Sequence, residues 1–327
     1  MNEFNNHQRL FNEETPAQVW EADVAKRSLD ALFSQARHYR TSKEYGDLMH
    51  FISRFRFYAP FNAMLIHVQM PGATFVATPS RWLEKYGRRI KPTARPLVIL
   101  QPMGPVMFVF DVSDTEPCSN SEKQARLFDK LMNKVPLGIE APFQVFHGKV
   151  GSELEKTIDN AKRDGVRIQV RKEGSQSAGS IRPAASSGNP KQKFQIRLDK
   201  DRKPIYTSVP VRYDIVINEN LDRETKYSSI VHELAHLYCG HLGTPNDKWW
   251  PDRRGLSRGS VEFEAESVTY LICQRLEIGN PSAQYLSGYL QGNENVPDIS
   301  LECILKTTGL IEQMGMERLK IRKEKVK

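Results

Sequence analysis

Two histidines and a glutamate stand close together in the segment SSIVHELAHLYCGH, residues 228–241. Residues four apart on an α-helix share a face, so His232 and His236 present their imidazoles in the same direction. Two imidazole nitrogens at this spacing can clamp a divalent metal, and Glu233 beside them can act as general base on a water molecule. The alternative, a pair of hydrogen-bonded core histidines, leaves Glu233 without a role. The motif therefore predicts a metal-dependent hydrolytic site.

A catalytic zinc site needs a third protein ligand, and the next apolar helix offers carboxylates. The segment SVEFEAESVTYLICQRLEI carries Glu262, Glu264 and Glu266 near its start. Glu262 and Glu266 share a face, whereas Glu264 points elsewhere. We expect Glu262 to be the third ligand and Glu266 to orient a ligating histidine, with Glu266 as the competing ligand. For Glu264 we expect a solvated position near the helix N-terminus, where the helix dipole favours an acid.

The expected cofactor is one Zn²⁺ ion per chain, although manganese or another divalent ion could substitute. A group that stabilises an oxyanion is also needed, and the sequence does not identify it. Tyr270 and His241 are the candidates for that role. His241 lies five residues after His236, off the ligand face, and is expected to be a helix-terminus residue rather than a ligand.

Composition narrows the class of protein. The chain has 327 residues and an apolar share of 39%, which suits a globular protein of one or two domains. No run of 18 apolar residues occurs, so no membrane span is expected. The polar N-terminal stretch does not resemble a signal peptide. Four cysteines without C-x-x-C spacing indicate free thiols in a reducing compartment, and we expect a cytoplasmic location.

Hydrophobic patterning predicts an α+β chain. Helices are expected at 16–33, 45–55, 61–70, 79–86 and 121–134, a hairpin through 96–112, and mainly helices after residue 222. The predicted divisions are 1–116, an N-terminal unit; 117–211, a connecting α/β region; 212–317, a mainly helical metallopeptidase domain; and 318–327, a basic tail. Within the connecting region, the Gly/Ser-rich stretch 174–193 is expected to be a flexible loop.

Positive charge gathers in the first half of the chain. The net charge is +8, and residues 51–110 hold eight basic residues against a single acid, Glu84. Aromatic residues interleave with these charges, as in grooves that bind single-stranded DNA by phosphate contacts and base stacking. The candidate DNA-binding residues are Arg54, Arg56, Arg81, Trp82, Arg88, Arg89 and Lys91. The alternative is that the aromatic residues are core and the arginines form a solvated face.

The pair HELAHLYCGH and EFEAESVTYLI, within about residues 212–290, resembles the ImmA/IrrE metallopeptidases, a zincin group. That resemblance implies an intracellular zinc peptidase with ligands at His232, His236 and Glu262 and with Glu233 as base. It also implies a protein or peptide substrate such as a transcriptional repressor.

Residues 61–102, FNAMLIHVQMPGATFVATPSRWLEKYGRRIKPTARPLVILQP, are similar to the N-terminal domain of ArdC-type antirestriction proteins. That domain binds single-stranded DNA and precedes a zincin domain. The two resemblances together imply an ArdC-like α+β domain followed by a zincin-like metallopeptidase domain. The leading hypothesis is a zinc-dependent metallopeptidase coupled to DNA binding. The alternative is a single-stranded-DNA-binding antirestriction or mobile-element protection protein with a structural or idle metal site.

Overall fold

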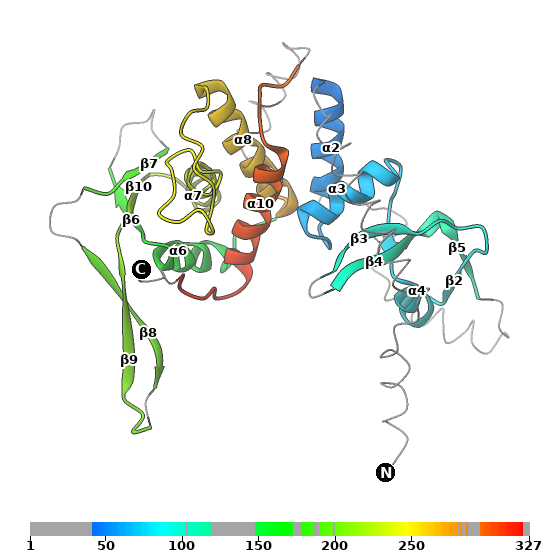
Figure 1. The fold of residues 1–327 in the computed structure, drawn as a ribbon, viewed down its shortest axis with the longest axis horizontal. Helices are drawn as coiled ribbons and strands as arrows, with labels where there is room; N and C mark the ends of the chain where they lie inside the picture. Colours follow the sequence, from blue (N-terminus) through cyan, green and yellow to red (C-terminus); the bar gives the residue numbers. More distant parts are fainter. Residues whose placement is uncertain are drawn as a thin grey trace. The chain divides into compact units, whose positions relative to one another are not determined.

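The computed structural model describes residues 41–101, 104–118, 148–172, 178–185, 190–198, 200–279, 282, 286 and 295–322. The chain divides into two compact units, the first formed by Met1–Tyr39 with Asn62–Gln144 and the second by Arg40–Phe61 with Val145–Lys327. Figure 1 traces the elements of both. The helices expected at 16–33 and 121–134 lie outside the described residues.

The first unit is a small α+β assembly. Its elements are most of α3 (Pro60–Gln69), β1 (Val76–Ala77), α4 (Pro79–Tyr86), β2 (Arg88–Ile90), β3 (Leu97–Gln101), β4 (Gly104–Asp111), a 3₁₀ turn (Val112–Asp114) and β5 (Thr115–Pro117). The strands form an antiparallel sheet of order β1-β4-β3 and a separate β2–β5 pair. The hairpin and α4 occur where the sequence predicts them. Thr78 caps α4 by accepting a hydrogen bond from the Arg81 amide, and Gly87 ends it in the left-handed region at φ 52°.

Among the described residues, the second unit combines a three-stranded sheet with five helices and a β-hairpin. Its elements are α2 (Ser42–Arg54), α6 (Glu153–Arg163), β6 (Val166–Arg171), β7 (Gly179–Pro183), β8 (Lys191–Leu198), β9 (Pro204–Pro210), β10 (Tyr213–Asn218), α7 (Arg223–Tyr238), α8 (Arg258–Arg275) and α10 (Leu301–Met316). Central strand β10 is parallel to β6 and antiparallel to β7. All six residues of β10 are buried, and α7 lies between this sheet and the helices α8 and α10.

The prediction of a flexible loop at 174–193 is wrong for the residues of this stretch that the structure describes. Residues 179–183 form β7, which pairs with β10 from Tyr213↔Pro183 to Ile217↔Gly179, and β8 begins at Lys191. Composition misled the prediction because Gly, Ser and Pro weaken strand propensity, whereas cross-strand pairing and packing against α7 decide the conformation here. At Gly179, a Cβ atom would lie 2.9 Å from Ile217 Cδ1, so the strand can approach its neighbour closely.

Helix α2 packs in the second unit, although the predicted division at residue 116 assigns it to the first. The Tyr45 hydroxyl donates to Ser267 Oγ on α8 at 2.7 Å, and the Tyr45 and Phe263 ring centroids are 5.2 Å apart. The buried Arg275 guanidinium of α8 donates to backbone carbonyls at the end of α2, including that of Ile52 at 2.9 Å. Since these contacts are tertiary, local patterning gave no sign of them.

All four cysteines are free, in keeping with the absence of C-x-x-C spacing. Among the described helices, none has the length and apolar character needed to cross a membrane.

Candidate metal centre

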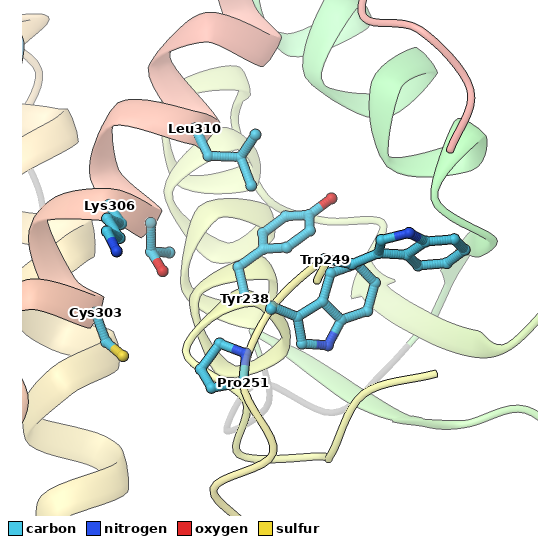
Figure 2. A pocket seen from close by; sticks show the side chains of 8 residues that line it. Tyr238, Trp249, Pro251, Cys303, Lys306 and Leu310 are labelled. Atoms are coloured by element: carbon cyan, nitrogen blue, oxygen red, sulfur yellow. The ribbon is translucent and has the colours of Figure 1, made fainter. Parts of the chain in front are cut away.

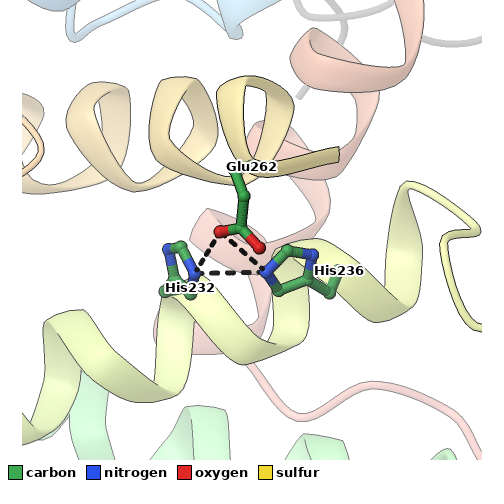
Figure 3. Close-up of side chains that lie close together, drawn as sticks. All are labelled: His232, His236 and Glu262. Carbon is green, nitrogen blue, oxygen red and sulfur yellow. Dashed lines mark hydrogen bonds and ion pairs between the residues drawn. The ribbon is translucent and has the colours of Figure 1, made fainter. Parts of the chain in front are cut away.

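The two histidines of the H-E-x-x-H segment meet Glu262 across the α7–α8 interface (Figure 3). The Nε2 atoms of His232 and His236 are 3.1 Å apart. Glu262 Oε2 lies 3.7 Å from the first of these nitrogens and 3.8 Å from the second. Ligand atoms bound 2.0–2.1 Å from a tetrahedral zinc ion are roughly 3.3 Å apart, so two nitrogens and one carboxylate oxygen at these separations fit such an ion.

Glu233 lies beside this cluster and is 7% exposed. Burial raises its pKa to about 7, while a hydrogen bond from the Ile181 backbone on β7 partly opposes that shift. Glu233 Oε1 would lie only 3.5 Å from a Cβ atom at Gly179. The carboxylate therefore lies between α7 and β7.

The electrostatics of the cluster favour the protonation states that metal binding needs at His236 and Glu262, but at His232 they favour the protonated ring. Burial, helped by the neighbouring His232, holds the pKa of His236 well below its ordinary value, so its imidazole is neutral at pH 7. Burial also acts to lower the pKa of His232, but the carboxylates of Glu262, Glu266 and Glu233 outweigh it and raise that pKa. The close approach of His232 lowers the pKa of Glu262, which keeps this carboxylate ionised.

Glu266 and Glu264 differ in their surroundings. Glu266 Oε1 lies 3.7 Å from His232 Nδ1, on the side of the ring away from Glu262. Glu264 is fully buried, so the solvated position expected for it is wrong. Its carboxylate lies 2.9 Å from His241 Nε2 and 2.6 Å from two guanidinium nitrogens of Arg253.

Sequence reasoning missed His241, Glu264 and Arg253 for reasons that the structure makes clear. The position of His241 was judged on a continuous helix, but α7 ends at Tyr238 and Gly240 turns the chain at φ 84°. Glu264 lies four residues before the buried Val268, so the apolar stripe of α8 did carry a signal for its burial. Arg253 belongs to a loop, and nothing in its local sequence indicates its partner.

A separate cavity of about 100 Å³ lies among α7, α10 and the loop after α7 (Figure 2). Its lining is mainly aromatic and aliphatic: Tyr238 belongs to α7, Trp249 and Trp250 to the loop after it, and Cys303 and Lys306 to α10. Its lining includes neither a histidine nor a carboxylate, so its chemistry differs from that of the cluster in Figure 3.

The candidate DNA-binding residues do not all belong to one unit. Arg54 and Arg56 lie in the second unit, and the other five lie in the first. Trp82 is fully buried and donates from Nε1 to the Phe110 carbonyl at 2.8 Å, which contradicts the stacking role expected for it. Its ring packs against Phe75 and Tyr86, so the core alternative describes this residue.

Three of the cations in this set contact other residues of the first unit. Arg88 donates to Thr115, Lys91 donates to the Ser113 carbonyl, and Arg89 pairs with Glu116 at 2.8 Å. Residues 62–118 hold six basic and four acidic residues. Three of the four acids, Asp111, Asp114 and Glu116, lie just after the basic segment 51–110. The net positive charge of this part is therefore small.

Comparison with known proteins gives one family match. Residues 189–270, about a quarter of the chain, match the model of the IrrE N-terminal-like domain, Peptidase_M78. The matched range contains His232, Glu233, His236 and Glu262. The resemblance to ImmA/IrrE metallopeptidases is thereby confirmed for this segment. A comparison with curated proteins finds no match.

Two solved structures of the antirestriction ArdC protein from the R388 plasmid are similar to the chain at 12% identity. The metal-free structure gives a TM-score of 0.35, with 79% of this chain and 85% of that chain covered. The Mn(II)-bound structure gives 0.33, with 78% and 84% covered.

Proposed function

We propose that the second unit is a zinc-dependent peptidase of the ImmA/IrrE type, which cleaves a protein or peptide substrate such as a regulatory protein. The observation that carries this proposal is the cluster of donor atoms from His232, His236 and Glu262, all within 4.8 Å of one another. Buried Glu233 beside that cluster supplies the general base that a purely structural metal site does not need.

His232, His236 and Glu262 would hold the metal. When bound, a divalent ion supplies Lewis acidity, which activates water and polarises the scissile carbonyl. A carboxylate oxygen of Glu233 accepts the proton of the attacking water and then delivers it to the leaving amine nitrogen.

Strand β7 suggests how a substrate would align. Within the described residues, β7 is at the edge of its sheet, and the backbone of Ile181 contacts Glu233. An extended peptide can add to a sheet edge through main-chain hydrogen bonds. We therefore expect the substrate segment to be extended and unfolded locally, with its scissile bond placed next to Glu233.

The variant Glu233→Gln tests the proposal. We expect it to keep one zinc ion per chain and the wild-type melting temperature, but to lower the cleavage rate by about 10²–10⁴-fold, because a glutamine cannot accept the proton. Mass spectrometry of an incubated peptide library measures cleavage, and elemental analysis measures zinc. The exposed Glu302→Gln is the matched control. Wild-type cleavage by Glu233→Gln, or a wild-type protein without zinc, would refute the proposal.

Binding of single-stranded DNA is a second candidate function, located on the first unit. Exposed Arg81 and Lys85 lie four residues apart on α4, and the Arg89 side chain on β2 is 60% exposed. These three cations can contact phosphates, whereas the buried Trp82 and Tyr86 are unsuited to stacking on bases.

A further inference from the structure

A buried chain of hydrogen bonds leads away from the candidate ligand His236. Its Nδ1 atom lies 3.0 Å from Nδ1 of His241, and His241 Nε2 lies 2.9 Å from Glu264 Oε2. The His241 and Glu264 side chains are 3% and 0% exposed. Nε2 of His236, which faces Nε2 of His232, is therefore linked through the rings of His236 and His241 to the fully buried carboxylate of Glu264.

The donors around Glu264 fix the direction of this chain. Arg253 approaches both of its oxygens at 2.6 Å, and the Ser300 amide donates to Oε1 at 2.6 Å. A guanidinium only donates, and a carboxylate paired with it in this bidentate manner accepts. His241 must then donate to Glu264 from Nε2, which leaves its Nδ1 as the acceptor in the neutral ring. His236 must donate from Nδ1, so its Nε2 lone pair faces His232 and Glu262.

The fold positions His241 through a glycine. Gly240 adopts φ 84°, and the His241 amide donates to the His236 carbonyl at 3.0 Å. A Cβ atom at Gly240 would lie 2.1 Å from the Pro251 carbonyl oxygen, so only glycine admits the loop that carries Arg253. The Arg253 amide in turn donates to the Gly240 carbonyl at 2.9 Å.

A second metal site is the competing interpretation, because Cys239, His241 and Glu264 also place donor atoms within 4.8 Å of one another. The Arg253 guanidinium already contacts both Glu264 oxygens, to which a second metal cation would have to bind. The Cys239 thiol is committed to Thr307 Oγ1 at 3.4 Å, and its burial raises the thiol pKa, which disfavours the thiolate that binds metals. The contacts therefore favour a hydrogen-bonded network over a second ion.

We propose that His241 and Glu264 are positioning residues that fix the tautomer and the ring orientation of His236 for metal binding. This inference rests on the proposed function, since it assigns His236 as a ligand. Partners of a ligating histidine typically change metal affinity by about 10–100-fold when they are removed.

The test compares the full-length wild type with His241→Leu, His241→Gln and Glu264→Gln. In the metal-free wild type, nitrogen-15 NMR of the histidine rings should show His236 protonated at Nδ1. His241→Leu should lose this fixed tautomer and bind zinc about 10–100-fold more weakly in competition with a chelator. His241→Gln should recover part of both, because its amide can accept from His236 and donate to Glu264. His50→Leu and Glu302→Gln, both at exposed positions, are the matched controls.

The outcomes separate the two proposals. A wild type that shows the Nδ1 tautomer but no zinc binding refutes the metallopeptidase function and with it the role of the network in metal binding. A His241→Leu protein with wild-type zinc affinity and wild-type His236 tautomer overturns the positioning role alone. If His241→Leu is unfolded by its melting curve, His241→Gln and Glu264→Gln decide, and wild-type zinc affinity in both overturns the inference.

Discussion

Removing a carboxylate that binds a metal lowers the metal affinity more than removing a carboxylate that only orients a ligating histidine. Glu262 faces the Nε2 atoms of both histidines, whereas Glu266 approaches only Nδ1 of His232. We expect Glu262→Ala to abolish tight zinc binding and Glu266→Ala to weaken it by about 10–100-fold. Chelator competition measures both affinities. If Glu266→Ala loses zinc and Glu262→Ala retains it, Glu266 is the metal ligand and Glu262 is the residue that orients the histidine.

For individual residues, the sequence predicted that His232, His236 and Glu262 would lie together, because the spacing of residues on each helix determines which of them share a face. His232 and His236 lie one turn apart on the same face of α7, and Glu262 on α8 faces them. The residues behind His236 were beyond prediction for a physical reason. Their positions depend on where α7 ends and on a loop that returns to Gly240, and neither follows from helical periodicity.

Strands β6 and β10 carry an ion pair whose contribution depends on pH. Arg167 Nε and Nη2 donate to the two oxygens of Asp214 at 2.6 and 2.9 Å, across an in-register parallel pair. The hydrogen bond from Arg167 lowers the pKa of Asp214. Because the folded pKa lies below the unfolded value of about 4, the stabilisation is complete above that pH and fades as the pH falls further.

We therefore expect Arg167→Met to lower the free energy of unfolding by about 1 kcal/mol at pH 7, a modest value because Arg167 is 40% exposed and screened by solvent. The difference from wild type should shrink at pH 3. Urea unfolding at both pH values measures it, with exposed Lys193→Met on β8 as the control. An equal difference at pH 7 and pH 3 would show that Asp214 ionisation is not involved.

The elements predicted best from sequence were those with local signals. Helix α4 has the predicted bounds, residues 79–86, and the β3–β4 hairpin lies within the predicted range 96–112. Strand β7 was missed because its five residues are stabilised by pairing with β10, which lies 30 to 38 residues away in the sequence. Local composition cannot report such a partner.

For the whole molecule, the position of α2 changes how the parts can be tested. Residues 40–61 belong to the second unit, where Tyr45, Leu48 and Ile52 are fully buried. A fragment ending at residue 116 would expose this apolar face, because it would lack the α8 residues that pack on α2, such as Phe263 and Arg275. Any assay of the first unit is therefore better made with the full chain.

The last prediction concerns DNA binding by the full-length protein. Because Trp82 is core, binding would depend on phosphate contacts from Arg81, Lys85 and Arg89 rather than on stacking. We expect weak, salt-sensitive binding of a labelled single-stranded oligonucleotide, with a log–log slope of about −0.7 for each phosphate contact. Fluorescence anisotropy at several salt concentrations measures the slope.

The double variant Arg81→Ala/Lys85→Ala should make that slope shallower by about 1.4, which corresponds to two lost contacts. Lys156→Ala/Lys306→Ala removes the same charge from exposed positions on α6 and α10 and should leave the slope unchanged if binding is confined to the first unit. Equal effects of the two double variants would indicate attraction by the overall charge of +8 rather than by a site. Absence of binding by the full chain at low salt would remove this second function and leave the peptidase as the activity to pursue.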